Sequence, residues 1–186
     1  MVYILLAEGF EEIEAIAPVD LLRRADIDIK TVSITNDLMV TGSHDIIIKA
    51  DIILSQIDFD AMEMLVLPGG LGGVNNIAKC SEAMDLINKT WENDKMLAAI
   101  CAAPTLLAKL DIIRGLSVIC YPSVGNEIVN AGGRLIHNKH VISDGNLITG
   151  KAAGSSFEFA LEIISVLRDR ETAEKIHCAI LGITYG

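Results

Sequence analysis

Residues 96–104 read MLAAICAAP, and this stretch decides the fold. The apolar run 96–100 has the length of a buried strand, and Pro104 suits the first turn of a helix, where its missing N–H is not needed. Small residues beside Cys101 permit the sharp, strained turn of a nucleophile elbow. The stretch therefore predicts a strand that turns directly into a helix, which is the repeating unit of an α/β sheet.

The same alternation of apolar runs and helical patterns continues on both sides of this stretch. Strands are expected at 2–7, 28–35, in one or two pieces over 38–54, at 63–68, at 96–100 and near 116–120, with a hairpin over 134–149 that turns at Asp144-Gly145. Helices are expected at 11–25, 80–93, 102–110, near 124–131, near 155–168 and at 171–181. This pattern predicts an α/β fold with a doubly wound, mostly parallel central sheet and helices on both faces. No linker, repeat or low-complexity tract divides the chain, so we expect a single domain over 1–186.

Composition narrows the class of partner. The formal net charge of −10 argues against nucleic acid and anionic membrane, because both select a basic surface. Aromatic residues make up 4% of the chain, which is too few for a base-stacking platform. A hydrophobic content of 51% excludes disorder. We therefore expect neither nucleic acid nor membrane among the partners.

The N-terminal residues favour a cytoplasmic location. The apolar run of MVYILLAEGFEE ends at Glu8 and has no basic flank, so it is not a secretory signal. No stretch approaches the roughly 20 apolar residues of a membrane span. We expect reduced thiols in this compartment. Three of the four cysteines, Cys80, Cys120 and Cys178, are expected to be packing residues.

Cys101 is the candidate nucleophile, because doubly wound sheets bind ligands beyond the carboxyl ends of their strands. There its sulfur would face the positive end of a helix dipole, and we expect a locally electropositive site. Such a position lowers the pKa of a thiol from about 8.5 to roughly 3.5–7.5 and gives a reactive thiolate. The alternative is that Cys101 is a small hydrophobe buried at a strand end.

The Gly-rich loop 69–73 follows another apolar strand. Glycines let backbone N–H groups approach a ligand closely, so Gly69 and Gly70 could donate to an oxyanion or a carboxylate. The loop lacks the glycine spacing of the dinucleotide-binding fingerprint. A simple Gly-rich turn is the alternative interpretation.

Acidic residues begin the first predicted helix. Glu11 and Glu12 are expected on a solvated face, where they would complement the helix dipole. Glu14 differs, because Pro18 four residues later cannot donate to its carbonyl and perturbs the helix there. If the Glu14 side chain points toward the strand ends, we expect its carboxyl to stay protonated and to donate to the Cys101 sulfur.

The remaining motifs predict no metal and no cofactor. The sequence GNLITGK starts like a phosphate loop, but Ala152 follows where a hydroxyl would hold magnesium. His137 and His140 lie three apart in the predicted hairpin and would point to opposite faces. His44 and His177 are isolated in the sequence.

Four motifs occur together: GFEEIEA at 9–15, VLPGG at 66–70, AAICAAP at 98–104 and SFEFA at 156–160. With these motifs the chain resembles the ThiJ/PfpI superfamily, in the branch of Parkinson-disease protein seven, from about residue 2 to residue 180. The resemblance implies a flavodoxin-like sandwich and a homodimer. It also implies site residues: Cys101 as the reactive cysteine, Glu14 as the carboxyl that hydrogen-bonds its sulfur, Gly69, Gly70 and Ala102 around the oxyanion, and Arg24 near the dimer interface.

Two departures from the family pattern bear on the chemistry. Many members carry a histidine beside the cysteine, where this chain has Tyr121. A tyrosine with a pKa near 10 can donate a hydrogen bond but is a poor base at neutral pH, so Glu14 becomes the main acid/base candidate. A Gly-Pro-Gly-Thr loop of relatives is replaced here by Ala152-Ala153-Gly154-Ser155, so we expect a different pocket wall.

Two functional hypotheses follow. In the first, Cys101 attacks an α-oxoaldehyde such as methylglyoxal, or its adducts on proteins, as a glutathione-independent glyoxalase or deglycase. In the second, the protein is a redox sensor or stress chaperone in which Cys101 is oxidised to a sulfinate that Glu14 stabilises. Peptidase activity is disfavoured, because no histidine occupies the expected position.

Overall fold

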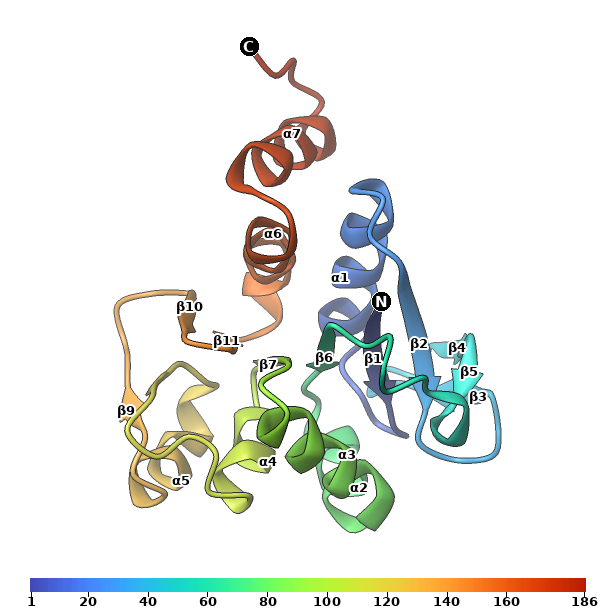
Figure 1. Ribbon diagram of the computed structural model, residues 1–186, viewed down its shortest axis with the longest axis vertical. Helices are drawn as coiled ribbons and strands as arrows, with labels where there is room; N and C mark the ends of the chain where they lie inside the picture. Colours follow the sequence, from blue (N-terminus) through green and yellow to red (C-terminus); the bar gives the residue numbers. More distant parts are fainter.

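A seven-stranded sheet runs through the middle of the computed structural model, which describes residues 1–186 (Figure 1). The strand order is β10-β11-β7-β6-β1-β2-β5, and every neighbouring pair is parallel except β10 with β11. The strands of this sheet are β1 (Val2–Leu6), β2 (Ile29–Ser33), β5 (Ile52–Ile53), β6 (Met64–Leu67), β7 (Met96–Ile100), β10 (Val141–Asp144) and β11 (Leu147–Gly150).

Helices cover both faces of the sheet (Figure 1). One face carries α1 (Glu12–Arg24), α6 (Ser156–Leu167) and, stacked on α6, α7 (Arg170–Leu181). The other carries α2 (Leu71–Lys79), α3 (Ser81–Glu92), α4 (Pro104–Lys109) and α5 (Gly125–Asn130). The predicted fold class is confirmed.

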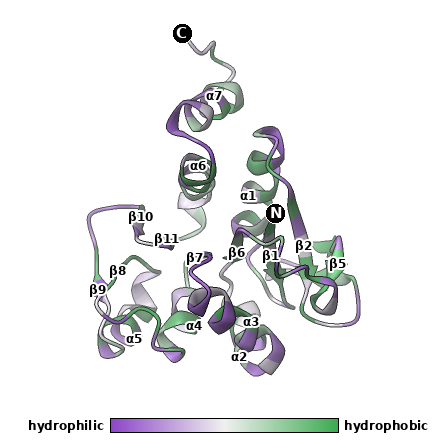
Figure 2. Cartoon of the chain, in the orientation of Figure 1, coloured by the Kyte–Doolittle hydropathy of each residue, from purple (hydrophilic) through white to green (hydrophobic).

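Alternation along the strands creates two hydrophobic cores. In β1, Val2, Ile4 and Leu6 point to the face of α1 and α6, whereas Tyr3 and Leu5 point to the face of α2 to α5. All five β1 residues are buried, as a parallel strand covered on both faces requires. Figure 2 shows hydrophobic colour in the central strands and hydrophilic colour in peripheral turns such as that between α6 and α7.

The structure corrects two local predictions. Helix α2 begins at Leu71, inside the stretch expected to be a loop, and precedes a separate α3. The predicted hairpin over 134–149 is confined to β10 and β11; β9 (Arg134–Leu135) instead pairs in parallel with β8 (Ser117–Val118). His137 and His140 therefore lie in the connection between β9 and β10 rather than in a hairpin.

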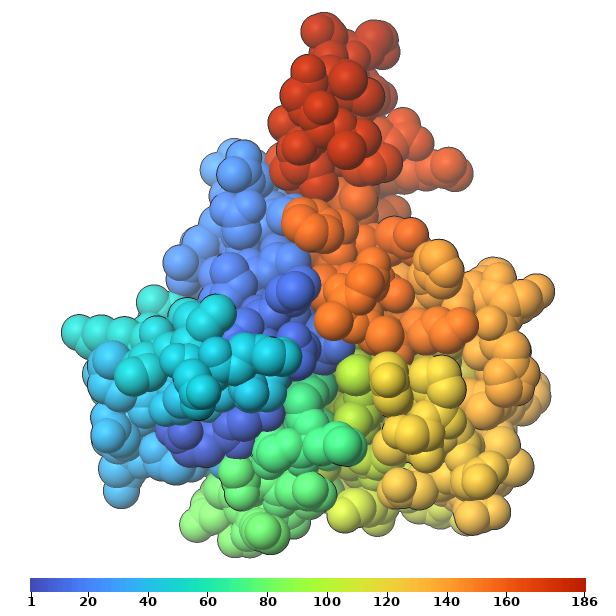
Figure 3. Space-filling model, turned by 180° about the vertical axis from the view of Figure 1, so that it is seen from behind, coloured from blue at the N-terminus to red at the C-terminus, as the bar shows by residue number.

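Two peripheral segments leave the main layers. The small hairpin of β3 (Met39–Thr41) and β4 (Ile47–Lys49) lies against α1, and in Figure 3 its cyan atoms lie across the blue N-terminal segment. Helix α7 buries only Ala173 and stands out from the body at the red C-terminal end (Figure 3). No helix combines the length and apolar character needed to cross a bilayer.

The strand order marks the carboxyl ends of β1 and β6 as the edge where a doubly wound sheet forms its ligand crevice. The chain winds outward from β1 through β2 and β5, then crosses back to β6 and continues through β7 to β11. Strand order therefore reverses between β1 and β6, where α/β sheets bind ligands. The segments that leave β1, β6 and β7 at this edge contain Glu14, Gly69 and Cys101.

Candidate functional site

Cys101 occupies a strained turn directly after β7. Its φ of 65° lies in the left-handed region, which is uncommon for a residue with a side chain. Neighbouring backbone holds it there: the Cys101 N–H donates to the carbonyl of Gly150 at 2.9 Å, and the N–H of Tyr121 donates to the Cys101 carbonyl at 2.8 Å. The predicted elbow is present, and it presents a partly exposed thiol.

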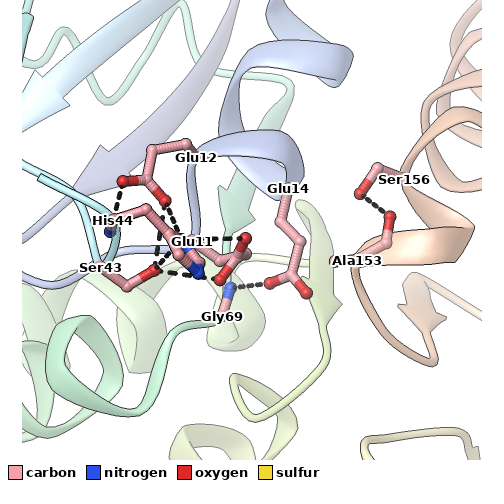
Figure 4. A network of polar contacts seen from close by, with 8 residues as sticks. All are labelled: Glu11, Glu12, Glu14, Ser43, His44, Gly69, Ala153 and Ser156. Carbon is pink, nitrogen blue, oxygen red and sulfur yellow. Dashed lines mark hydrogen bonds and ion pairs between the residues drawn. The ribbon is translucent and has the colours of Figure 1, made fainter. Parts of the chain in front are cut away.

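Glu14 lies on α1 with its side chain turned to the same crevice. The residue has 0% of its surface exposed, and Oε2 accepts the Gly69 N–H at 2.8 Å (Figure 4). Its other oxygen, Oε1, is buried with no hydrogen-bond partner in the protein. A buried oxygen without a partner is costly unless it is protonated or meets a ligand.

Glycines are required at 69 and 70 for different reasons. A Cβ on Gly69 would lie 2.4 Å from Glu14 Oε2 and 2.7 Å from Cys101 Cβ, so only glycine leaves room for both side chains against this backbone. Gly70 has a φ of 84°, and a Cβ there would also collide with the backbone of residues 9–11. The segments that follow β1, β6 and β7 therefore pack closely at these two glycines, because neither glycine has a side chain.

The Glu14 carboxyl and the Cys101 thiol hold their protons unusually tightly. Burial raises the pKa of Glu14 to about 7, although contacts with the Cys101 thiol and the Gly69 amide partly oppose this rise. Burial and the charge of Glu14 raise the pKa of Cys101 to about 12, while the amides of Ala102 and Gly70 partly lower it. Near neutral pH the exchangeable proton of the pair is therefore that of the carboxyl.

The expectation of a low thiol pKa is wrong. Helix α4 has only six residues and begins three positions after Cys101, so its dipole acts weakly on the sulfur. Burial and the neighbouring carboxylate act more strongly in the opposite direction. The sequence motif located the elbow correctly but could not show that other segments partly bury the thiol.

A family model described as the DJ-1/PfpI family matches residues 1–166. The chain belongs to the DJ-1/PfpI family. Protein dj-1beta of Drosophila melanogaster is 38% identical over 178 residues, which cover 96% of this chain and 95% of that protein. The crystal structure of the same fly protein covers 99% of this chain and 98% of its own, with a TM-score of 0.92.

Two other relatives in this family span most of the chain. The Parkinson disease protein 7 homolog of Danio rerio is 30% identical, over 96% of this chain and 95% of its own length. A deglycase of Pyrococcus abyssi is 26% identical, over 90% of this chain and 99% of its own length. The family and branch inferred from the sequence motifs are thereby confirmed.

The other predicted site residues of this DJ-1/PfpI member differ in their distance from the thiol. Ala102 is buried beside it and offers its backbone N–H, as Gly70 does. The Gly69 N–H is taken by Glu14, so that amide supports the carboxyl rather than an oxyanion. The Tyr121 side chain is 46% exposed. Arg24, at the far end of α1, is exposed and paired with Asp20 at 2.8 Å.

A cluster of Glu11, Glu12 and His44 lies beside Glu14 (Figure 4), and the sequence did not predict it. Glu12 is 6% exposed rather than solvated as expected. Its carboxylate accepts the His44 N–H at 2.7 Å, the Ser43 hydroxyl at 3.1 Å, and contacts His44 Nδ1 at 2.9 Å. His44 is therefore not isolated; the pair fastens the β3–β4 hairpin to α1.

The charge state of this cluster follows from its contacts. Burial alone would raise the pKa of Glu12, but hydrogen bonds from His44 and Ser43 lower it to about 2. The bond to Glu12 raises the pKa of His44. Glu11, Glu12 and His44 place ligand atoms within 4.8 Å of one another. Donors from Ser43 and His44 already hydrogen-bond to the Glu12 carboxylate, so its oxygens do not need a metal ion as partner.

Replacing Glu14 by glutamine should change how stability depends on pH. The folded protein holds the Glu14 proton more tightly than the unfolded chain, so this group makes the free energy of unfolding fall as pH rises from 4.5 to about 7. Glu14→Gln keeps an acceptor for the Gly69 N–H and cannot ionise. At pH 8 we expect it to be more stable than the parent by up to ~3 kcal/mol.

Denaturant unfolding at pH 5 and pH 8 measures this difference. Glu127→Gln, which changes an exposed carboxylate on α5, is the matched control and should leave the pH dependence unchanged. An advantage for Glu14→Gln that is no larger at pH 8 than at pH 5 would show that Glu14 does not carry a raised pKa.

Proposed function

We propose that this protein is an enzyme that converts α-oxoaldehydes such as methylglyoxal, or their adducts on proteins, without glutathione. The observation that carries the proposal is the buried, unpartnered Oε1 of Glu14 in the crevice that also contains Cys101. Such an oxygen can exchange a proton with a molecule bound at the sulfur. The naming of a related Pyrococcus protein as a deglycase supports the same class of substrate.

The first step forms a carbon–sulfur bond. Because the thiol is neutral, it needs a base as it attacks, and the Glu14 carboxylate takes its proton. The sulfur adds to the aldehyde carbon, and the carbonyl oxygen becomes an oxyanion beside the N–H groups of Gly70 and Ala102. Return of the proton from Glu14 to this oxygen gives the neutral hemithioacetal.

The second step moves a proton between carbons. The Glu14 carboxylate removes the proton from the former aldehyde carbon, which gives an enediolate, and returns it to the neighbouring carbon. The hydroxyl proton of the hemithioacetal moves to the oxygen on that neighbouring carbon, so the product is a 2-hydroxy thioester. Water then hydrolyses the thioester and restores the thiol. The balance is one aldehyde and one water consumed for each 2-hydroxy acid released. With a carbinolamine adduct as substrate, the C–N bond breaks as the C–S bond forms, and the amine leaves with the thiol proton that Glu14 delivers.

Activity should require both members of the pair and should rise with pH. Purified protein with methylglyoxal is assayed for lactate, and we expect Cys101→Ser to abolish production while Cys178→Ser on α7 retains it. Glu14→Gln should lose about 10²–10⁴-fold in rate. Because the carboxylate is the active form, the parental rate should increase as pH passes about 7 and then level off. Equal lactate production by Cys101→Ser and the parent would refute the proposal.

A redox function is the second candidate, and the same orphaned oxygen favours it. Two equivalents of peroxide convert a thiol to a sulfinic acid with release of two waters. A protonated Glu14 could donate to a sulfinate oxygen and hold the oxidised side chain. We expect mild peroxide to add two oxygens at Cys101. Glu14→Gln or Glu14→Leu should change the fraction of the protein that carries this sulfinate. Intact mass with peptide mapping measures this; preferential oxidation of Cys80, Cys120 or Cys178 would contradict it.

We also propose a homodimer formed through α1 and the adjacent hairpin. Large apolar side chains are exposed there, with Ile13 at 52% on α1 and Ile47 at 57% on β4. Exposed apolar clusters of this kind mark interaction surfaces. Sedimentation equilibrium should give a dimer, and Ile47→Asp should shift it toward monomer, whereas Lys109→Asp on α4, which covers the other face of the sheet, should not. A monomer at high concentration would exclude the dimer.

A further inference from the structure

A cavity lies away from Cys101, between α3 and the connection from β5 to β6. Its volume is about 640 Å³, within the range of small-molecule sites. The connection contains only one turn of 3-10 helix, η1 (Leu54–Gln56), where a doubly wound sheet usually has a full helix. A single 3-10 turn covers less of the sheet edge at β5 than a full helix would.

Apolar side chains form the floor of this cavity. Leu54, Ile57 and Phe59 come from the connection, and Leu86 comes from α3. All four are half-buried and pack against the larger hydrophobic core. The floor therefore rests on rigid structure and offers an apolar surface to a ligand.

The charges around the cavity favour a cation. Lys89 Nζ lies 3.8 Å and Lys95 Nζ 5.0 Å from the centre of the Phe59 ring, so this ring already accepts ammonium groups; Lys95 is also held by the Met62 carbonyl at 2.6 Å, which leaves Lys89 as the lysine that a ligand could displace. Lys89 thereby leaves Asp85, four residues earlier on α3, without an ion pair, although both line the cavity. Glu82 adds a second carboxylate, whose donors are its neighbours Ser81 and Cys80.

We propose that this cavity binds a small organic cation, consisting of an ammonium group on an apolar body. The ammonium would lie between the Asp85 carboxylate and the Phe59 ring, and the apolar body would lie on Leu54 and Ile57. Lys89 is exposed and occupies the ring face in the absence of ligand, so it acts as an internal competitor. An anionic ligand would meet two carboxylates and is disfavoured.

Three probes of similar size test the charge preference: benzyltrimethylammonium, benzyl alcohol and phenylacetate. We titrate each into the full-length protein and follow backbone amide resonances. The ammonium should perturb residues 54–59 and the α3 amides, and should bind at least ~5-fold more tightly than the other two. Equal binding of all three, or no perturbation of these residues by the ammonium, would overturn the proposal.

Two substitutions should act in opposite directions. Lys89→Met removes the internal competitor and should tighten benzyltrimethylammonium binding several-fold, whereas Asp85→Asn should weaken it by ~3–10-fold. Glu174→Gln on α7 is the control and should change nothing. If Lys89→Met weakens binding, or Asp85→Asn leaves it unchanged, the ammonium does not occupy this position.

Cys80 gives an independent readout because it lines the same cavity. In a Cys101→Ser background, saturating benzyltrimethylammonium should slow alkylation of Cys80 by iodoacetamide at least ~3-fold and leave Cys178 on α7 unaffected. Unprotected Cys80 would place the ligand elsewhere. This result does not depend on the proposed catalytic function, because the variant lacks the reactive thiol.

Discussion

The hydrogen bond from the Gly69 amide to the buried Glu14 carboxyl is the contact around which the functional edge of the sheet is built. It joins α1, which follows β1, to the loop that follows β6, on either side of the point where strand order reverses. Gly69 must lack a side chain so that Glu14 and Cys101 can both lie against it. One backbone N–H thus orients the carboxyl, while the other carboxyl oxygen is left for chemistry.

Burial determines which of the two acidic groups is useful at neutral pH. The Cys101 thiol, with a pKa near 12, keeps its proton, whereas the Glu14 carboxyl, with a pKa near 7, exchanges one readily. The roles expected from isolated side chains are therefore reversed, because the carboxyl rather than the thiol titrates close to neutrality. The nearby Glu12 shows the opposite case: donors from His44 and Ser43 outweigh its burial, and its pKa is low.

Much of the fold could be predicted because buried parallel strands leave a plain signal in the sequence. Runs such as Val2–Leu6 and Met96–Ile100 are apolar on both faces and could be placed to within a residue. Helix α2 was missed because Gly72, Gly73, Asn75 and Asn76 are weak helix formers. Its conformation depends instead on packing of the loop against the backbone of residues 9–11, which no local pattern reveals.

In the candidate site, too, features that depend on local sequence could be predicted, and features that depend on packing between distant segments could not. The elbow at Cys101 and the acid at Glu14 could be inferred from motifs, because each depends on its own neighbours in the chain. The bond between Glu12 and His44 joins residues 32 positions apart, and the raised pKa of the thiol depends on burial by several segments. Both are properties of the assembled fold, and sequence spacing carried no signal for them.

The hydrogen bond from Cys101 to the Gly150 carbonyl also has a consequence for the timing of biogenesis. Strand β7 pairs with β11, which lies some fifty residues later in the chain, so the elbow gains this support only after β11 has been synthesised. Parallel pairing of distant strands is a slow step in folding. During translation Cys101 therefore emerges before its hydrogen-bond acceptor, Gly150, has been synthesised. The arrangement of groups around the thiol is complete only when β11 pairs with β7.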